Sequence, residues 1–256
     1  MRGPEGPTSP PAARARATAT TTRASSFSTH PLSPTLSPHS PSPPLPSLPP
    51  PLSTVGDVHG DLGKCIAALE IAGVLAEDER RSPVWTGGDA TVVQLGDVLD
   101  RGDNEIGVIM LLRDLDRQAR AAGGAVVMLN GNHESLNVCG DFRYVTPGGF
   151  REAAAAAGLR GDRASSLDAQ LRARLALYSP GGPIARELAS NPTVLVIGAT
   201  VFAHGGLLPA HVTYGLARLN ADVAAWMRGD RLPDGAHAPP AFLAMGDASS
   251  VMWNRA

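Results

Sequence analysis

The sequence predicts an α/β fold, and three observations lead to this class. Short apolar runs rich in β-branched residues alternate with stretches of helical periodicity from residue 54 onward. Clusters of Gly, Asp, His and Asn follow the apolar runs. Strands that alternate with helices indicate a sheet with parallel pairing at its centre, where ligands gather beyond the carboxyl ends of the strands.

Residues 1–53 differ from the rest, because they hold 14 of the 23 prolines, four arginines and a single acid, Glu5. Such a segment buries too little apolar surface to offset its chain entropy, so we expect it to be disordered. Its Ser- and Arg-rich, acid-poor composition favours a transit peptide for a plastid. The alternatives are a proline-rich tail or sequence upstream of the true start. In either of these cases we expect the protein to be cytoplasmic.

Residues 54–256 are sufficient for one domain with a sizeable core, since 43% of the 256-residue chain is hydrophobic. The net charge of -2 argues against a general affinity for nucleic acid. No apolar run approaches the roughly 18 residues that a membrane span needs, so we expect no membrane insertion. Cys65 and Cys139 lie in no metal-ligand spacing and are interpreted as free thiols.

The first predicted strand ends at Val55, and we expect it to be truncated, because PPPLSTV leaves little room for it. A helix follows with Asp61 as N-cap and with one apolar stripe, made of Leu62, Cys65, Ile66, Leu69 and Ala72. Trp85 is interpreted as a packed aromatic of a turn before the second strand, Thr91–Leu95. This order makes the first β-α pair.

The next helix starts near Asn104, ends at the Gly123-Gly124 pair and is expected to face the core with Ile106, Ile109, Met110 and Leu112. Asp103 is the expected N-cap of this helix. A third strand, Ala125–Leu129, and two more strands, Thr193–Ile197 and Thr200–Ala203, complete the set. Residues 153–178 are predicted to form a helical insertion that covers the site as a lid.

Four polar clusters come directly after predicted strands. GDVHGD follows the first strand, GDVLDRG the second, GNHE the third and HGG (His204–Gly206) the last. Ordinary turns would contain scattered Ser, Pro and Lys instead. We therefore expect the four loops to form one site. His211 and His237 lie outside these motifs and are expected to face solvent in loops, and His30 and His39 belong to the proline-rich segment.

The clusters contain ligands for divalent cations, namely Asp57, His59, Asp97, Asn132 and His204. A mixed set of carboxylate, amide and imidazole ligands suits Mn, Fe or Zn better than Ca. If the Asp97 carboxylate is shared between two ions, it makes a two-metal hydrolytic site that activates a bridging water. The planar fork of Arg101 suits phosphate oxygens.

In this order, GDVHG, GDVLDRG, GNHE and HGG resemble the signature of the phosphoprotein phosphatase (PPP) metallophosphatases. Two longer stretches, GDVLDRGDNEI and NGNHESLNVCGDFRYVTPGGF, are similar to the Shewanella-like protein phosphatase branch. The resemblance covers Val55 to Ala256. It implies a β-sandwich of mixed sheets flanked by helices, with a dinuclear metal site at the strand ends and a phosphorylated protein as substrate.

The resemblance also implies a role for each site residue. The first metal would be held by Asp57, His59 and Asp97, and the second by Asp97, Asn132 and His204. His133 would be the general acid that protonates the leaving group, and Asp100 would orient it. Glu134 would be a structural acceptor. Arg101 and Arg255 would bind the phosphate.

One departure from the family pattern leaves alternatives open. The family has a further metal-binding histidine downstream of the position that matches Arg255, but the sequence ends at Ala256. Residues 54–256 are therefore expected to be a calcineurin-like metallophosphatase domain that is incomplete at its C-terminus. The alternative functions are a dinucleoside polyphosphate hydrolase, which would use the same motifs, and a catalytically impaired binding fragment.

Overall fold

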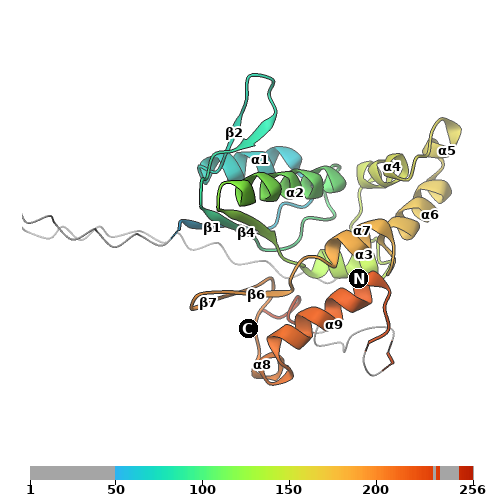
Figure 1. Ribbon diagram of the computed structural model, residues 1–256. Helices are drawn as coiled ribbons and strands as arrows, with labels where there is room; N and C mark the ends of the chain where they lie inside the picture. Colours follow the sequence, from blue (N-terminus) through green and yellow to red (C-terminus); the bar gives the residue numbers. More distant parts are fainter. Residues whose placement is uncertain (1–49, 233–234, 237–247, 256) are drawn as a thin grey trace, which may run out of the picture. The chain divides into compact units, whose positions relative to one another are not determined.

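A computed structural model describes residues 50–232, 235–236 and 248–255, and its elements confirm the α/β class (Figure 1). The strands are β1 (Leu52–Val55), β2 (Leu75–Glu77), β3 (Pro83–Trp85), β4 (Thr91–Gln94), β5 (Ala125–Met128), β6 (Val194–Ile197) and β7 (Thr200–Ala203). The helices are α1 (Leu62–Ile71), α2 (Glu105–Ala121), α3 (Asn132–Val138), α4 (Pro147–Ala156), α5 (Asp162–Ser165), α6 (Leu167–Tyr178), α7 (Pro183–Leu188), α8 (Pro209–Tyr214) and α9 (Leu216–Arg228). The expected disorder of residues 1–49 and the expected loop position of His237 lie outside the described residues.

The sheet that positions the site is parallel, with the strand order β1-β4-β5. Val55 pairs with Gln94, and Gln94 pairs with Met128, so the three strands end at the same edge. The helix α1 and the β2–β3 pair lie between β1 and β4 in the chain, and α2 connects β4 to β5. The loops that leave this edge therefore start side by side, as the sequence predicted.

The expected truncation of the first strand is wrong. β1 begins at Leu52 and has four residues, as do β4 and β5. The domain boundary predicted at residue 54 therefore falls inside a strand. Pro50 and Pro51 did not prevent pairing, because β1 lies at an edge of the sheet order and Thr91 N donates to the carbonyl of Pro51.

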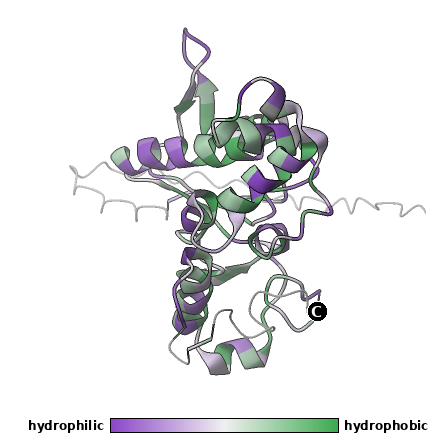
Figure 2. Cartoon of the chain, turned by 90° about the vertical axis from the view of Figure 1, so that its right-hand side faces the viewer, coloured by the Kyte–Doolittle hydropathy of each residue, from purple (hydrophilic) through white to green (hydrophobic). Residues whose placement is uncertain are grey.

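The other strands form two antiparallel pairs. β6 and β7 turn through Gly198-Ala199, since Ile197 pairs with Thr200, which confirms the predicted strands. The β2–β3 pair was not predicted, and its connecting turn, residues 78–82, is hydrophilic (Figure 2). Trp85 is buried as expected, but it lies in β3 rather than in a turn, and its indole N–H donates to Gly88 O at 2.9 Å.

The helix α1 follows its predicted pattern. Cys65 and Leu69 are fully buried, and the Asp61 carboxylate accepts the backbone N–H of Lys64 at 3.0 Å as an N-cap. In Figure 2 the helices carry hydrophilic and hydrophobic residues in alternating bands. Such bands are typical of surface helices that cover a core with one face.

Two predictions for α2 are wrong. Met110 is 61% exposed, because the buried face of the helix follows Val108, Ile109, Leu112 and Leu115, and Met110 lies on the opposite side at 3.6 residues per turn. Asp103 is not the N-cap, since that position is Asn104. The Asp103 carboxylate instead accepts the hydroxyl of Thr146 at 2.6 Å.

His211 does not face solvent. It is fully buried in α8, where its Nδ1 accepts the backbone N–H of Leu208 and its Nε2 lies 2.9 Å from Ser249 O. Both ring nitrogens are therefore satisfied, which allows a polar ring to be buried without a ligand. This outcome could not be predicted because Ser249 is far away in the sequence.

The predicted helical insertion is present as α4, α5 and α6, of which α4 and α6 pack against each other. Among the residues that the structure describes, none of the helices has both the length and the apolar character that a membrane span requires.

Leu112 and Met110 provide a matched test of the core. Replacing the buried Leu112 by Ala should reduce the free energy of unfolding by about 2–5 kcal/mol, because it removes apolar contacts and leaves a cavity. Replacing the exposed Met110 by Ala in the same helix should change it by less than about 0.5 kcal/mol. Urea denaturation measures both. Equal effects would show that the assignment of the buried face is wrong.

Candidate metal centre

The four predicted loops meet around the buried carboxylate of Asp97. Its Oδ2 lies 3.9 Å from His59 Nε2, 3.8 Å from His133 Nε2 and 3.4 Å from His204 Nε2. Its Oδ1 accepts the backbone N–H of His133 at 3.0 Å. One carboxylate therefore faces three imidazoles that come from three different loops.

Two groups of side chains have ligand atoms that all lie within 4.8 Å of one another. They are His59, Asp97 and His133 in one group and Asp57, Asp97 and His204 in the other. Asp97 belongs to both, as a shared ligand would. The amide oxygen of Asn132 joins the second group, because it lies 2.8 Å from His204 Nε2. The structure thus brings together all five residues that the sequence predicted as ligands.

The hydrogen bonds of two histidines test whether a cation fits. His59 Nδ1 donates to Leu99 O at 2.9 Å, and His204 Nδ1 donates to Leu95 O at 2.8 Å. Each bond leaves the Nε2 lone pair free to bind a metal. His59 Nε2 is buried and has no hydrogen-bond partner among the described residues.

The acceptor atoms of the second group face each other. His204 Nε2 is directed at the Asn132 oxygen and at Asp97 Oδ2. Burial disfavours a charged His204 ring, but the hydrogen bond and the charge of Asp97 outweigh burial and raise its pKa. The facing nitrogen and oxygen lone pairs are satisfied by a positive charge between them, either a ring proton on His204 or a bound cation. The donor set therefore fits a divalent ion.

The backbone is strained at the same place. His59, Asp97, Asp100 and Arg101 have φ angles of 45°, 56°, 69° and 62°, in the left-handed region. Each such residue costs about 1–2 kcal/mol. Strain that is concentrated in two loops at one site must be compensated by the surrounding contacts.

Glu134 supplies these contacts and confirms the interpretation of this residue as a structural acceptor. Its carboxylate accepts the backbone N–H groups of Asp97, Val98, Leu99 and Gly131 at 2.7–3.1 Å. Burial and the charge of Asp97 raise the pKa of Glu134 to about 7, while the bonds from the backbone oppose this rise. The loop after β4 is thereby fastened to the start of α3.

Gly131 and Gly102 allow the loops to approach closely. A Cβ on Gly131 would lie 2.3 Å from Asp97 Oδ1, and one on Gly102 would lie 2.2 Å from His59 O. Both distances are shorter than any real contact, so a side chain at either position would displace a metal-site residue.

His133 is placed as a proton donor requires. Its Nδ1 lies 2.6 Å from Asp100 Oδ2, as predicted. The centre of the Tyr144 ring lies 5.0 Å from the centre of the His133 ring. Burial acts to lower the pKa of His133, but the bond to Asp100 and the nearby carboxylates raise it overall. Arg101 Nη2 lies 3.2 Å from Nε2, so a basic group stands beside the nitrogen that faces the site.

A cavity of about 450 Å³ opens at this site. It is lined by residues of the loops after β1 and β4, including Asp57, His59 and Arg101. Its lining includes no residue of the predicted lid, so the lid role stays a prediction. Arg255 is exposed and donates to the carbonyl of Asn254 at 3.2 Å, and its phosphate-binding role also stays a prediction.

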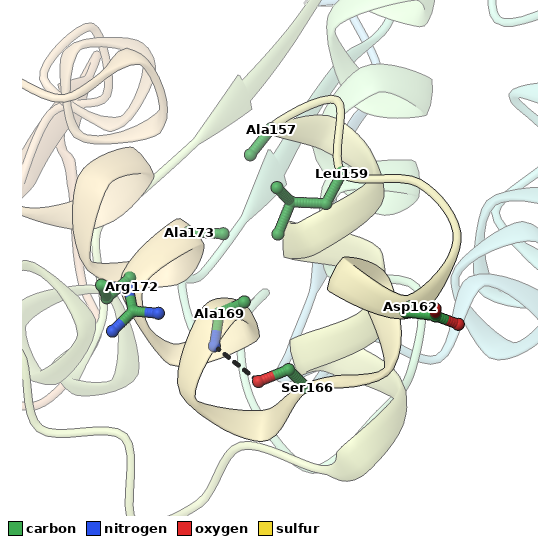
Figure 3. Close-up of a pocket in the computed structure, with 7 residues that line it drawn as sticks. All are labelled: Ala157, Leu159, Asp162, Ser166, Ala169, Arg172 and Ala173. Atoms are coloured by element: carbon green, nitrogen blue, oxygen red, sulfur yellow. Dashed lines mark hydrogen bonds between the residues drawn. The ribbon is translucent and has the colours of Figure 1, made fainter.

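A larger cavity of about 590 Å³ lies among α4, α5 and α6, away from this chemistry (Figure 3). Its polar groups already have local roles. The Ser166 hydroxyl accepts Ala169 N as a helix cap, Arg172 pairs with Asp168, and Asp162 points outward. The centre around Asp97 is therefore the better candidate for a functional site.

Sequence analysis missed three residues next to the site, namely Glu105, Asn137 and Arg174. All three are fully buried and polar. Asn137 lies one helical turn after His133, a spacing that could have suggested contact with the same loop. No local signal distinguishes Arg174 from Arg172, the exposed arginine of the same helix.

Replacing Glu134 by Gln should reduce the free energy of unfolding by about 2–4 kcal/mol, because the amide NH₂ would face backbone N–H donors and leave them unpaired. Glu70→Gln on the exposed face of α1 is the control and should be near neutral. Urea denaturation of both variants measures the difference. A Glu134→Gln variant as stable as the control would show that this anchor is dispensable.

Comparisons with known proteins agree with the site. The matched region of Shewanella-like protein phosphatase 2 from Arabidopsis thaliana is 40% identical and covers 80% of this chain and 57% of that protein. Shewanella-like protein phosphatase 1 of Plasmodium berghei is 29% identical over 60% of this chain and 38% of its own length. The chain spans about half the length of the curated relatives it matches.

A solved structure has a similar fold. A cold-active protein-tyrosine phosphatase of a psychrophilic Shewanella superposes with a TM-score of 0.51, with 25% identity, over 72% of this chain and 52% of that chain. The family model described as calcineurin-like phosphoesterase matches residues 52–234, which include all the candidate ligand residues gathered around Asp97. The chain therefore belongs to the calcineurin-like phosphoesterase family.

Proposed function

We propose that this protein hydrolyses phosphate monoesters with the help of divalent metal ions, and that its substrates are phosphorylated proteins. One observation carries the proposal. The Asp97 carboxylate lies within 3.4–3.9 Å of three imidazole nitrogens, beside a His133–Asp100 pair held at 2.6 Å. Such an arrangement combines oxygen and nitrogen ligands for divalent cations with a group that can donate a proton.

The metal ions would be held by Asp57, His59, Asp97, Asn132 and His204, with Asp97 shared. They would lower the pKa of a water molecule for attack on phosphorus and neutralise charge on the phosphate oxygens. Mixed nitrogen and oxygen ligands support Mn as the native metal, with Fe or Zn as alternatives.

The protein side chains would perform the remaining steps. Arg101 lines the cavity and would bind phosphate oxygens through its planar fork. His133, oriented by Asp100, would give a proton to the leaving oxygen, so that the leaving group departs as a neutral alcohol. The neighbouring Tyr144 ring, at 5.0 Å, would limit the motion of the imidazole.

The names of the relatives support a protein substrate, since those proteins are phosphatases of the Shewanella-like group and a protein-tyrosine phosphatase. Peptides that carry phosphoserine, phosphothreonine or phosphotyrosine should release phosphate when Mn is present. Dinucleoside polyphosphates are the comparison. Faster hydrolysis of these than of every phosphopeptide would favour the alternative function.

Asp97→Asn should lower the affinity for divalent metal at least tenfold, because the shared ligand would lose its charge and keep its size. Metal content after dialysis and calorimetric titration with Mn measure this effect. Asp89→Asn, at an exposed position before β4, is the control and should bind metal as the wild type does. Retention of the full metal content by Asp97→Asn would contradict the shared position.

His133→Asn should slow the release of poor leaving groups roughly 10²–10⁴-fold, because general-acid catalysis contributes that much. Activated aryl phosphates need little protonation and should be affected less. Turnover of alkyl and nitrophenyl phosphates, measured at equal metal content, checks the difference. An equal loss for both classes would show that His133 is not the leaving-group acid.

A further inference from the structure

The helical segment α4–α6 places a fully buried arginine, Arg174 of α6, in the neighbourhood of the site. Its five N–H donors match five hydrogen bonds. Nε and Nη2 donate to Asn137 Oδ1, Nη1 and Nη2 donate to the two oxygens of Glu105, and Nη1 also donates to Gly149 O. The guanidinium is therefore fully used, and its position is determined by fixed partners.

Aromatic rings enclose the same guanidinium. Its carbon lies 4.4 Å from the centre of the Tyr178 ring, 5.4 Å from that of Phe142 and 5.8 Å from that of Phe150. Burying a charge in this way is expensive unless every donor is satisfied. If this position served only to fill the core, Leu or Met would fill it without the desolvation penalty of a buried charge. The arginine therefore has a role beyond packing.

The first connection from Arg174 runs through Asn137 to the Asp100 side chain. Asn137 Nδ2 donates to Asp100 Oδ1 at 3.0 Å, while Asn137 Oδ1 is occupied by Arg174. Arg174 at one end, and Asp100 and the carbonyl of His133 at the other, thereby determine which end of the amide faces Asp100. Without it, the amide could turn its oxygen toward the carboxylate, and the two acceptors would repel each other.

The second connection runs through Glu105 to the Asp100 backbone. Glu105 Oε1 accepts the backbone N–H of Asp100 at 2.6 Å, and the same carboxylate is held by two bonds from Arg174. Asp100 has a left-handed φ of 69°. Both the strained backbone and the carboxylate of Asp100 are therefore held by groups that Arg174 orients, and Arg174 Nη2 itself lies 3.7 Å from Asp100 Oδ1.

We infer that Arg174 is a positioning residue, which acts through Asn137 and Glu105 to hold Asp100 in the orientation that keeps His133 directed at the substrate. Arg174 touches neither metal ligands nor substrate. This inference rests on the proposed function of His133 as a leaving-group acid. The inference also gives the helical segment a role in the reaction, because Arg174 of α6 fixes the orientation of the Asp100 and His133 side chains.

Two variants in the full chain test the inference. Arg174→Lys keeps the charge beside Glu105 but lacks the fork, so it cannot hold both Glu105 and Asn137. Asn137→Asp keeps an acceptor for Arg174 and removes the donors to Asp100 and to the carbonyl of His133, so it breaks the first connection without leaving the arginine unpaired. Arg113→Lys is the control, since Arg113 also makes several bonds, to Glu187, Ser190 and Asn191, outside this network.

The first measurement compares kcat/KM for an alkyl phosphate and for nitrophenyl phosphate at equal metal content and equal circular dichroism. Arg174→Lys and Asn137→Asp should lose roughly 10–100-fold with the alkyl ester. They should lose less than about threefold with the aryl ester, which needs little protonation. Arg113→Lys should leave the ratio of the two unchanged. A uniform loss for both esters would overturn the inference.

The second measurement does not depend on activity. In metal-free protein with ¹⁵N-labelled histidine, the proton shared between His133 Nδ1 and Asp100 should give a low-field signal that moves or disappears in both variants and stays in Arg113→Lys. An unchanged signal in both variants, or the same change in the control, would overturn the inference. If the chain hydrolyses no phosphate ester, the proposed function fails while a changed signal still supports the positioning role.

Discussion

The site depends most on the hydrogen bonds that the Glu134 carboxylate accepts from the backbone. Four backbone N–H groups converge on it, three from the loop after β4 and one from Gly131 at the start of α3. These donors would otherwise be buried without partners, at a cost of about 1–3 kcal/mol each. By satisfying them together, one side chain holds two loops from neighbouring parallel strands in contact, and every other feature of the centre follows from this contact.

The arrangement of the candidate metal ligands is a consequence of this contact between the two loops. Once the two loops are fastened, Asp97 lies where the imidazoles of His59, His133 and His204 reach it. The left-handed backbone at Asp97 and Asp100 is tolerated because the loop has little freedom to relax. Rigid ligands also suit the proposed chemistry, since a preorganised site needs no rearrangement while charge develops on the phosphate.

A second buried network supports the same loop from another direction. Arg174, Glu105 and Asn137 surround Asp100, and all of their bonds are made within the protein interior. Burial raises the pKa of Glu105 despite its pairing with Arg174, whereas burial acts to lower the pKa of Arg174 and the charge of Glu105 raises it overall. Together with Glu134, this network fixes the position of the Asp100–His133 pair, so the helices between the third and fourth motifs help to position residues of the proposed site.

The sequence by itself determined the α/β class, the parallel strands and the candidate ligands that the structure brings together, because apolar periodicity and the four polar clusters are local patterns that can be read without knowledge of the fold. It also predicted the Asp100–His133 contact and the structural role of Glu134 through the resemblance of their motifs. Only the tertiary structure decided that Trp85 lies in a strand, that Met110 is exposed and that His211 is buried. The same holds for Arg174, whose partners Glu105 and Asn137 lie 69 and 37 residues away in the chain. Burial and hydrogen-bond partners of this kind are set by contacts between distant segments, and no local pattern of residues records them.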